Sequence, residues 1–139
     1  MSDIMKMTVP GKAEYVRAVR MTASALASDA GFDIEEIDDI KVAISEACTN
    51  IVLHGAEDGS IHYDVAFELD DEKLVICVED QGPGYDLEEY VEPVPGQIEE
   101  SGGLGIFIIR ALMDEVDIRS EVGMGTFICM KKYRHGTDA

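Results

Sequence analysis

The sequence predicts an α+β fold, a two-layer sandwich in which helices cover one face of a mixed, mainly antiparallel sheet. Between residues 14 and 53, apolar residues recur at three- and four-residue steps, which is the period of an amphipathic helix. From residue 61 they alternate with polar residues, as in strands with one covered face. Short turns separate the predicted strands, so consecutive strands pair antiparallel and the helices gather on one face.

The first half of the chain is predicted to hold one short strand and two helices. Residues 3–10, "DIMKMTVP", alternate loosely and end at a proline, which indicates a strand. A helix follows over residues 14–30, and Gly31 is a natural stop for it. Asp33 is placed to cap a second helix, which has acidic residues in its first turn and runs to about Leu53.

The second half is predicted to hold four strands and one helix. Residues 61–69 alternate, residues 70–73 form a hairpin loop, and "LVICVED" at 74–80 is apolar enough for a central strand. Residues 82–103 contain three of the four prolines, and a loop of this length is usually functional or disordered. A helix over 104–113 and strands over 115–121 and 126–133, joined by a glycine turn, complete the fold.

The bulk properties indicate one globular, cytoplasmic domain over residues 1–139. Of these residues 46% are hydrophobic, enough for a single core. No apolar run approaches the roughly 20 residues that cross a bilayer, and the N-terminus lacks the layout of a secretion signal. Cys48, Cys77 and Cys129 lie in apolar segments without CxxC spacing, so we expect small buried hydrophobic residues in preference to metal ligands or a redox pair.

Acidic residues dominate the charge of the chain. It has 29 Asp and Glu against 11 Lys and Arg, which gives a net charge of −18. Such a chain repels nucleic acid and anionic membranes and attracts a basic partner, although solubility alone is the other explanation. We therefore expect no direct contact with nucleic acid or membrane. A bound polyphosphate would depend on backbone amides and a divalent cation.

Three polar residues share one face of the second predicted helix, in "SEACTNIVLHG". Glu46, Asn50 and His54 are four residues apart, and their face borders the apolar stripe. A carboxylate and an amide one turn apart suit Mg²⁺, which prefers oxygen ligands. Glu46 is also suited to positioning or deprotonating a nucleophile. An ordinary solvated face is the alternative.

The strand at 74–80 runs into "EDQGPGY", an acidic residue followed closely by two glycines. Asp80 is placed to accept a hydrogen bond from an exocyclic amine such as that of adenine. Gly82 and Gly84 leave room for a flat ring against the backbone. The alternative is a tight turn whose aspartate bonds its own backbone.

A third motif, "SGGLGIF", leads into the predicted helix at 104–113. Gly102, Gly103 and Gly105 lie where free backbone amides attract an anion. No Lys or Arg occurs between Lys73 and Arg110, so a phosphate here would be held by amides and metal alone. The pattern is neither a Walker A loop nor a dinucleotide fingerprint, and a mobile glycine-rich loop is the alternative.

Together the three motifs resemble the ATP site of the GHKL superfamily, the histidine-kinase-like ATPases with the Bergerat fold. They are Glu-x3-Asn on a helix, Asp-x-Gly-x-Gly after a strand, and Gly-Gly-x-Gly at a helix start. The resemblance implies that Asn50 binds Mg²⁺, that Asp80 reads adenine, and that residues of about 85–101 form an ATP lid. The nucleotide-binding residues that it implies are Asn50, Asp80, Gly82, Gly84, Gly102, Gly103, Leu104, Gly105 and Thr126.

Within that superfamily, three stretches resemble the anti-sigma-factor serine kinases of the RsbW/SpoIIAB type. They are "VPGKAEYVRAVR", "EIDDIKVAISEACTNIVLHG" and "GGLGIFIIRALMDEV", and the resemblance covers about residues 7–133. It implies a homodimeric, Mg·ATP-dependent kinase that binds a sigma factor and phosphorylates a serine on its STAS-type antagonist. Glu46 is then the general base.

Two other functions stay open from the sequence. One is a nucleotide-gated sigma-factor-binding module with little or no catalysis, in which the acidic surface holds a basic segment and Glu46 is vestigial. The other is a GHKL ATPase that releases phosphate and has another partner. Phosphoserine on a protein acceptor distinguishes the kinase from both.

Overall fold

The computed structural model describes residues 2–54, 61–80, 103–121 and 125–135. The predicted elements occur in the predicted order, and each begins and ends within about two residues of its expected position. They are β1 (Asp3–Pro10), α1 (Val16–Asp29), α2 (Ile34–His54), β2 (His62–Leu69), β3 (Lys73–Asp80), α3 (Gly103–Leu112), β4 (Glu115–Glu121) and β5 (Gly125–Tyr133). A short 3₁₀ helix, η1 (Ala13–Tyr15), was not predicted and leads into α1.

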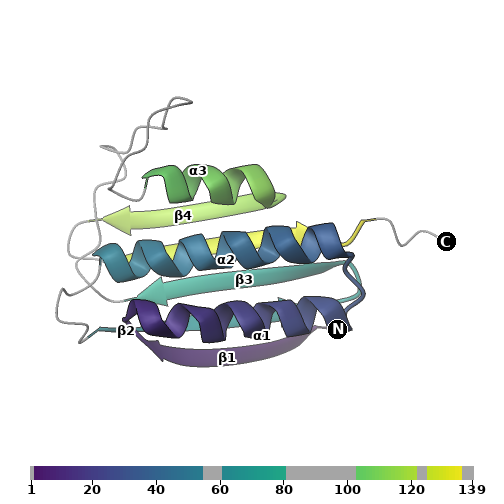
Figure 1. The fold of residues 1–139 in the computed structure, drawn as a ribbon, viewed down its shortest axis with the longest axis horizontal. Coiled ribbons are helices and arrows are strands. Elements are labelled where there is room, and N and C mark those ends of the chain that lie inside the picture. The colour runs from purple at the N-terminus through teal and green to yellow at the C-terminus, as the bar shows by residue number, and fades with distance from the viewer. Residues whose placement is uncertain (1, 55–60, 81–102, 122–124, 136–139) are drawn as a thin grey trace.

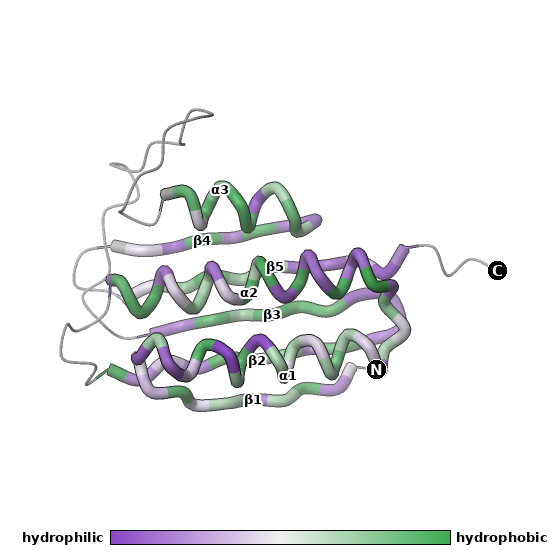
Figure 2. Tube along the Cα trace, in the orientation of Figure 1, coloured by the Kyte–Doolittle hydropathy of each residue, from purple (hydrophilic) through white to green (hydrophobic). Residues whose placement is uncertain are grey.

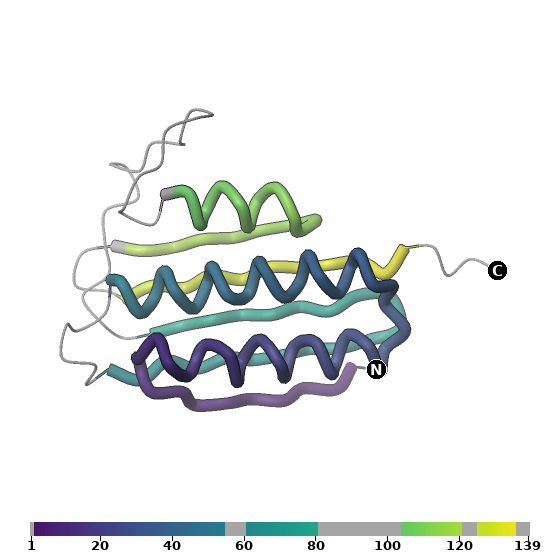
Figure 3. The backbone as a smooth tube through the Cα atoms, viewed as in Figure 1, coloured from purple at the N-terminus to yellow at the C-terminus, as the bar shows by residue number. Residues whose placement is uncertain are grey.

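The five described strands form one sheet in the order β1-β2-β3-β5-β4, and every pairing between them is antiparallel. β5 is the last strand in the chain, yet it lies between β3 and β4. After β3 the chain therefore reaches the edge strand β4 first and then returns inward, as the colours in Figure 3 show. This return places the start of β5 beside the end of β3, with Thr126 opposite Asp80.

The described helices all cover the same face of the sheet, which confirms the predicted two-layer sandwich (Figure 1). α2 lies in the middle of the helix layer and contacts α1, α3, β3 and β5. Hydrophobic and hydrophilic positions alternate along α2, whereas β3 is hydrophobic over most of its length (Figure 2). In the described part of the chain, no helix combines the length and the apolar character that crossing a bilayer requires.

The hydrophobic core lies between the helix layer and the sheet. Alternate residues of each inner strand point into it, and full burial of each large side chain contributes roughly 1.5–3 kcal/mol. Fully buried core residues include Val19, Ala23 and Ala27 of α1, Ile40, Ile44 and Ala47 of α2, Val65 and Phe67 of β2, Ile76 and Val78 of β3, and Ile128 and Met130 of β5.

The junction between α1 and α2 agrees with the prediction from the sequence. Gly31, the predicted stop, follows α1 with φ of 89°, a left-handed conformation that suits glycine. Asp33 caps α2 as predicted, because its Oδ1 accepts the Glu36 N–H at 2.8 Å. Glu36 returns the bond, since its Oε1 accepts the Asp33 N–H at 2.9 Å. The pair forms a capping box, which fixes where α2 begins.

Candidate functional site

Asn50 lies in the last turns of α2 and is only 2% exposed. Among the described residues, neither its amide oxygen nor its amide nitrogen has a hydrogen-bond partner. Leaving a buried polar group without a partner costs about 1–3 kcal/mol. A side chain that carries this cost in the folded protein is suited to a ligand that supplies the missing partner.

The three residues on the polar face of α2 differ in their exposure. Glu46 and His54 are half-buried, and Asn50 between them is buried. Helix geometry places the three side chains on one side of α2, as the four-residue spacing predicts. This side borders the core, so the alternative of an ordinary solvated face is wrong for Asn50.

Glu46 meets the start of α3 at Gly105. A Cβ atom built on Gly105 would lie 2.8 Å from Glu46 Oε2, and the next nearest atoms are Glu46 Cβ at 3.7 Å and Cδ at 3.8 Å. Only a residue without a side chain leaves the carboxylate its present position. The glycine motif and the carboxylate, far apart in the sequence, are therefore in direct contact.

Asp80 ends β3 on the side of the sheet that faces the helices, and it is 3% exposed. Its Oδ1 accepts the N–H of Thr126 on β5 at 2.8 Å. That oxygen therefore links two neighbouring strands. The contact brings together Asp80 and Thr126, the two residues that the resemblance assigns to the adenine end of the site.

Ser120 on β4 extends this polar row across a third strand. Its hydroxyl lies 2.9 Å from the hydroxyl of Thr126 and donates to the carbonyl of Gly125 at 3.2 Å. All three polar side chains of the row are buried. The sequence analysis missed Ser120, because a serine in an alternating strand gives no signal until the partner strand is known.

The candidate residues gather at one end of the molecule. The C-terminal end of α2, the end of β3, the start of β5 and the start of α3 all lie at the left of Figure 1. Leu104, in the first turn of α3, is half-buried. Three predicted positions, Gly82, Gly84 and Gly102, and the predicted lid over 85–101 lie outside the described residues.

The donor set fits Mg²⁺ held jointly with phosphate, and does not fit a metal held by protein alone. In the described ranges, no group of three His, Cys, Asp or Glu side chains is arranged to hold a metal ion. Mg²⁺ usually keeps several waters and binds one or two protein oxygens together with the phosphates of a substrate. The amide oxygen of Asn50, which has no hydrogen-bond partner among the described residues, is a suitable single oxygen ligand.

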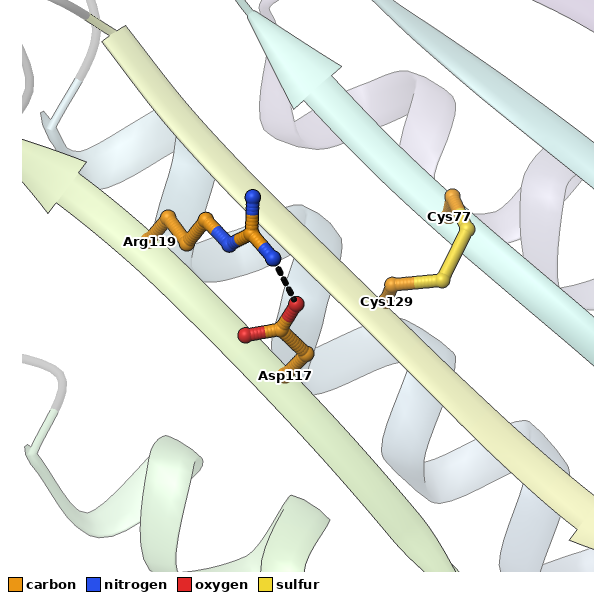
Figure 4. The surroundings of a disulfide bond; sticks show 4 residues. All are labelled: Cys77, Asp117, Arg119 and Cys129. Carbon is orange, nitrogen blue, oxygen red and sulfur yellow. Dashed lines mark ion pairs between the residues drawn. A yellow bond between two sulfur atoms is a disulfide. The ribbon is translucent and has the colours of Figure 1, made fainter.

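The helix-free face of the sheet carries a disulfide that the sequence analysis did not predict (Figure 4). Cys77 and Cys129 are directly opposite on β3 and β5 and are bonded to each other. The expectation of unpaired, buried cysteines is therefore wrong for this pair. Strand register brings together residues 52 positions apart, and periodicity does not reveal register. Cys48 is free and buried, as expected.

A hollow of about 360 Å³ adjoins Cys129 between the outer sides of β4 and β5. Arg119 on its wall pairs with Asp117 at 2.9 Å (Figure 4). The Arg119 guanidinium also lies 5.8 Å from the centre of the Phe127 ring. Exposed ion pairs of this kind contribute about 0–1 kcal/mol. The hollow is on the opposite face of the sheet from the polar row of Asp80, so it is not part of the candidate site.

Comparisons with known proteins identify the family. Residues 9–132 match the model of the histidine kinase-like ATPase domain. The serine-protein kinase RsbW of Halalkalibacterium halodurans is 38% identical over 129 residues, which cover 88% of this chain and 79% of that protein. RsbW of Bacillus subtilis is 35% identical, with 97% of this chain and 88% of that protein covered. RsbW of Listeria innocua is 39% identical, with 96% and 88% covered.

Solved structures agree with this result. The structure of the RsbU and RsbW domains of Rv1364c from Mycobacterium tuberculosis matches with a TM-score of 0.67 at 28% identity, over 94% of this chain and 32% of that longer chain. A blue-light activated histidine kinase of Erythrobacter litoralis, at 20% identity and a TM-score of 0.58 over 86% of this chain and 42% of that one, shares the fold alone. The chain belongs to the RsbW family of serine-protein kinases, within the histidine kinase-like ATPases.

Proposed function

We propose that this chain is a Mg·ATP-dependent protein-serine kinase and anti-sigma factor. In this proposal it binds a sigma factor. It also phosphorylates a serine on a STAS-type protein that opposes its binding to the sigma factor. The RsbW relatives, which are named serine-protein kinases, support the reaction. The observation that carries the proposal is the buried amide of Asn50, which has no partner in the described part of the chain and lies one helical turn from a carboxylate. By family resemblance alone, we also propose one ATPase domain over residues 1–139 and a homodimer.

The residues proposed to hold the nucleotide come from α2, from the ends of β3 and β5, and from the segment that leads into α3. Asn50 would bind Mg²⁺ through its amide oxygen. Asp80 would accept a hydrogen bond from the exocyclic amine of adenine, while its Oδ1 also accepts the N–H of Thr126. With no Lys or Arg between 73 and 110, backbone amides near the start of α3 would bind the phosphates. The glycines proposed to lie against the nucleotide are Gly82, Gly84, Gly102 and Gly103.

Glu46 is proposed as the catalytic base. When bound, Mg·ATP supplies the phosphoryl group and the positive charge that offsets its negative oxygens. Glu46 would orient the incoming serine hydroxyl and accept its proton, as a positioned carboxylate does in general base catalysis. Its half-buried position leaves it accessible to a protein substrate while α3 limits where its carboxylate lies.

Two substitutions one turn apart on α2 test these roles. We expect Asn50→Ala to abolish measurable Mg·ATP binding in calorimetry, because it removes the proposed oxygen ligand. The fold should be kept, because the amide that is lost has no partner in the described structure. We expect Glu46→Gln to bind Mg·ATP within about threefold of the unsubstituted protein and to lose about 10²–10⁴-fold in phosphotransfer. Thr49→Ala, at an exposed position between them, is the matched control and should change neither.

Phosphotransfer is measured with γ-labelled ATP and a purified candidate STAS-type antagonist, and the phosphoserine is located by mass spectrometry. Normal nucleotide binding by Asn50→Ala would contradict the proposed site. If the unsubstituted protein binds Mg·ATP and the sigma factor but leaves no phosphoserine on the antagonist, the nucleotide-gated binding module is the better description. Phosphate release without a protein acceptor would favour the ATPase.

A further inference from the structure

Gly105 occupies a helical position at which the backbone does not call for glycine. It lies in the first turn of α3, and the glycines with positive φ in the described part of the chain are Gly31 and Gly125. At such a position alanine is the better helix former, because glycine loses more backbone freedom on folding. The reason for glycine at position 105 must therefore lie in what surrounds it.

Among the described residues, the side chain of Glu46 lies nearest to the position that a Cβ on Gly105 would take. The three atoms nearest to a Cβ built on Gly105 all belong to Glu46, and Oε2, at 2.8 Å, is closer than side chains normally approach. The α3 backbone thus forms a wall against which the carboxylate rests. In the GHKL resemblance Gly105 borders the triphosphate, whereas in this structure its contact is with the proposed base.

A methyl group at position 105 would move the carboxylate and leave the fold unchanged. The clashing atom is the free end of a flexible side chain, so rotation of Glu46 relieves the contact without shifting α2 or α3. Phosphotransfer is far less tolerant, since a misplacement of about 1 Å at a reacting group can cost on the order of 100-fold in rate.

We propose that Gly105 is a positioning residue for Glu46: it leaves the space that sets where the carboxylate meets the incoming serine hydroxyl. This inference rests on the proposed function, in which Glu46 is the base. It assigns to the third glycine of the motif a role in the phosphotransfer step that is separate from nucleotide binding. A side chain there should lower the rate of the chemical step and leave the nucleotide site intact.

The test compares Gly105→Ala with Ala111→Gly, which makes the reverse exchange at an exposed position of the same helix, away from Glu46. We expect Gly105→Ala to keep or raise the thermal midpoint, to bind Mg·ATP within about threefold, and to lower kcat at least about tenfold with little change in KM for the antagonist. Ala111→Gly should leave kcat and Mg·ATP affinity unchanged. A fall in Mg·ATP affinity as large as the fall in kcat would overturn the inference and return Gly105 to the phosphates.

A double substitution tests the contact itself. Glu46→Asp shortens the side chain by one methylene group and withdraws the carboxylate from the space beside Gly105. In the Gly105→Ala background, Glu46→Asp should therefore lower kcat by a smaller factor than it does alone, or should raise it. Strictly additive effects on kcat would show that the two residues do not act through one contact.

The carboxyl ¹³C resonance of Glu46 separates failure of this inference from failure of the proposed function. We expect the resonance to shift in Gly105→Ala and to stay in place in Ala111→Gly, whatever the activity. Suppose that the resonance shifts in Gly105→Ala but Glu46→Gln keeps full phosphotransfer. The contact between Gly105 and Glu46 would then stand, but Glu46 would not be the base and Gly105 would not position a catalytic group. An unshifted resonance in Gly105→Ala would reject the contact while leaving the kinase proposal untouched.

Discussion

Cys48 of α2 and Tyr63 of β2 are both fully removed from water in the core. Burial raises the pKa of the Cys48 thiol from 9.0 to about 12. Burial also raises the pKa of the Tyr63 hydroxyl, and the neighbouring Cys48 raises it further. The folded state disfavours the charged form of each group, so each contributes to stability only while it keeps its proton.

This arrangement predicts a loss of stability in alkaline solution. The thiol contribution should be fully present below about pH 9 and should be lost as the pH rises toward 12, because the unfolded thiol ionises first. Urea denaturation at about pH 8 and about pH 10.5 measures the difference in the free energy of unfolding. Cys48→Ala should show a smaller alkaline loss than the unsubstituted protein, and Tyr63→Phe should reduce the part that begins above pH 10. Equal losses in Cys48→Ala and the unsubstituted protein would contradict the assignment to the thiol.

Asn50 and Glu46 show what a sequence can and cannot say about a site. Their shared face was predictable, because a spacing of four residues fixes the side of a helix. Their different burial was not, since it depends on the sheet and on α3, whose residues follow more than 50 positions later. The spacing alone therefore left the solvated face open beside the ligand site.

The start of α2 is held by more than the predicted cap. Glu36 bonds back to Asp33 through Oε1, and its Oε2 accepts the N–H of His135 beyond the end of β5 at 2.7 Å. A single buried carboxylate thus joins the capping box to the C-terminal end of the sheet. The nearby guanidinium of Arg134 donates to the carbonyls of Ala30 and Asp71, both at 2.9 Å, and ties the same corner together.

We expect Glu36→Ala to lower the free energy of unfolding by about 1–3 kcal/mol, because two backbone N–H groups lose a charged acceptor. Glu35→Ala is the matched control: it removes the same charge from the same helix turn but sits on the exposed side, and it should cost about 0.5 kcal/mol. Urea denaturation of both variants measures the difference. Equal costs would mean that helix dipole and surface charge, not the capping box, account for the effect.

The elements themselves were predictable because hydrophobic period is a local property. Helical steps, alternation and one continuous apolar run identified the described α-helices and strands, but not the short η1, and the glycine and proline positions placed most of the ends. Pairing between strands is not local: the antiparallel pairs of β2 with β3 and of β4 with β5 were predicted, but the order of the strands in the sheet and the contacts that depend on it were not. The bond between Cys77 and Cys129, the hydroxyl contact of Ser120 and the packing of Gly105 on Glu46 all depend on which elements lie side by side.

The order of the strands matters most for the site. A simple succession of hairpins would have put β4 beside β3, but β5 occupies that place and brings Thr126 to Asp80. Thr126 entered the predicted site through family resemblance, because nothing in its own neighbourhood indicates a contact with a residue 46 positions earlier. The fold thus assembles the proposed adenine end from two strands that the sequence keeps apart.

The net charge of −18 acts on the whole molecule and should affect its two kinds of ligand in opposite directions. A basic segment of a sigma factor is attracted over distances comparable with the Debye length, which is about 10 Å at 0.1 M salt. Mg·ATP carries negative charge and is repelled by the same field, since no Lys or Arg between 73 and 110 counters it. Short-range contacts must therefore supply the nucleotide affinity.

We expect the association rate constant for the sigma factor to fall at least about tenfold between roughly 50 and 500 mM KCl, with a dissociation rate constant that changes by less than about threefold. Over the same range the association rate constant for Mg·ATP should stay constant or rise, because salt screens a repulsion. Stopped-flow measurements on one protein preparation give both slopes, and each serves as the control for the other. A sigma-factor rate that ignores salt would mean that apolar contacts guide the encounter. A nucleotide association rate that falls with salt would require a positive potential at the site. Basic residues elsewhere in the fold or on a partner subunit would then have to supply it, because none lies between Lys73 and Arg110.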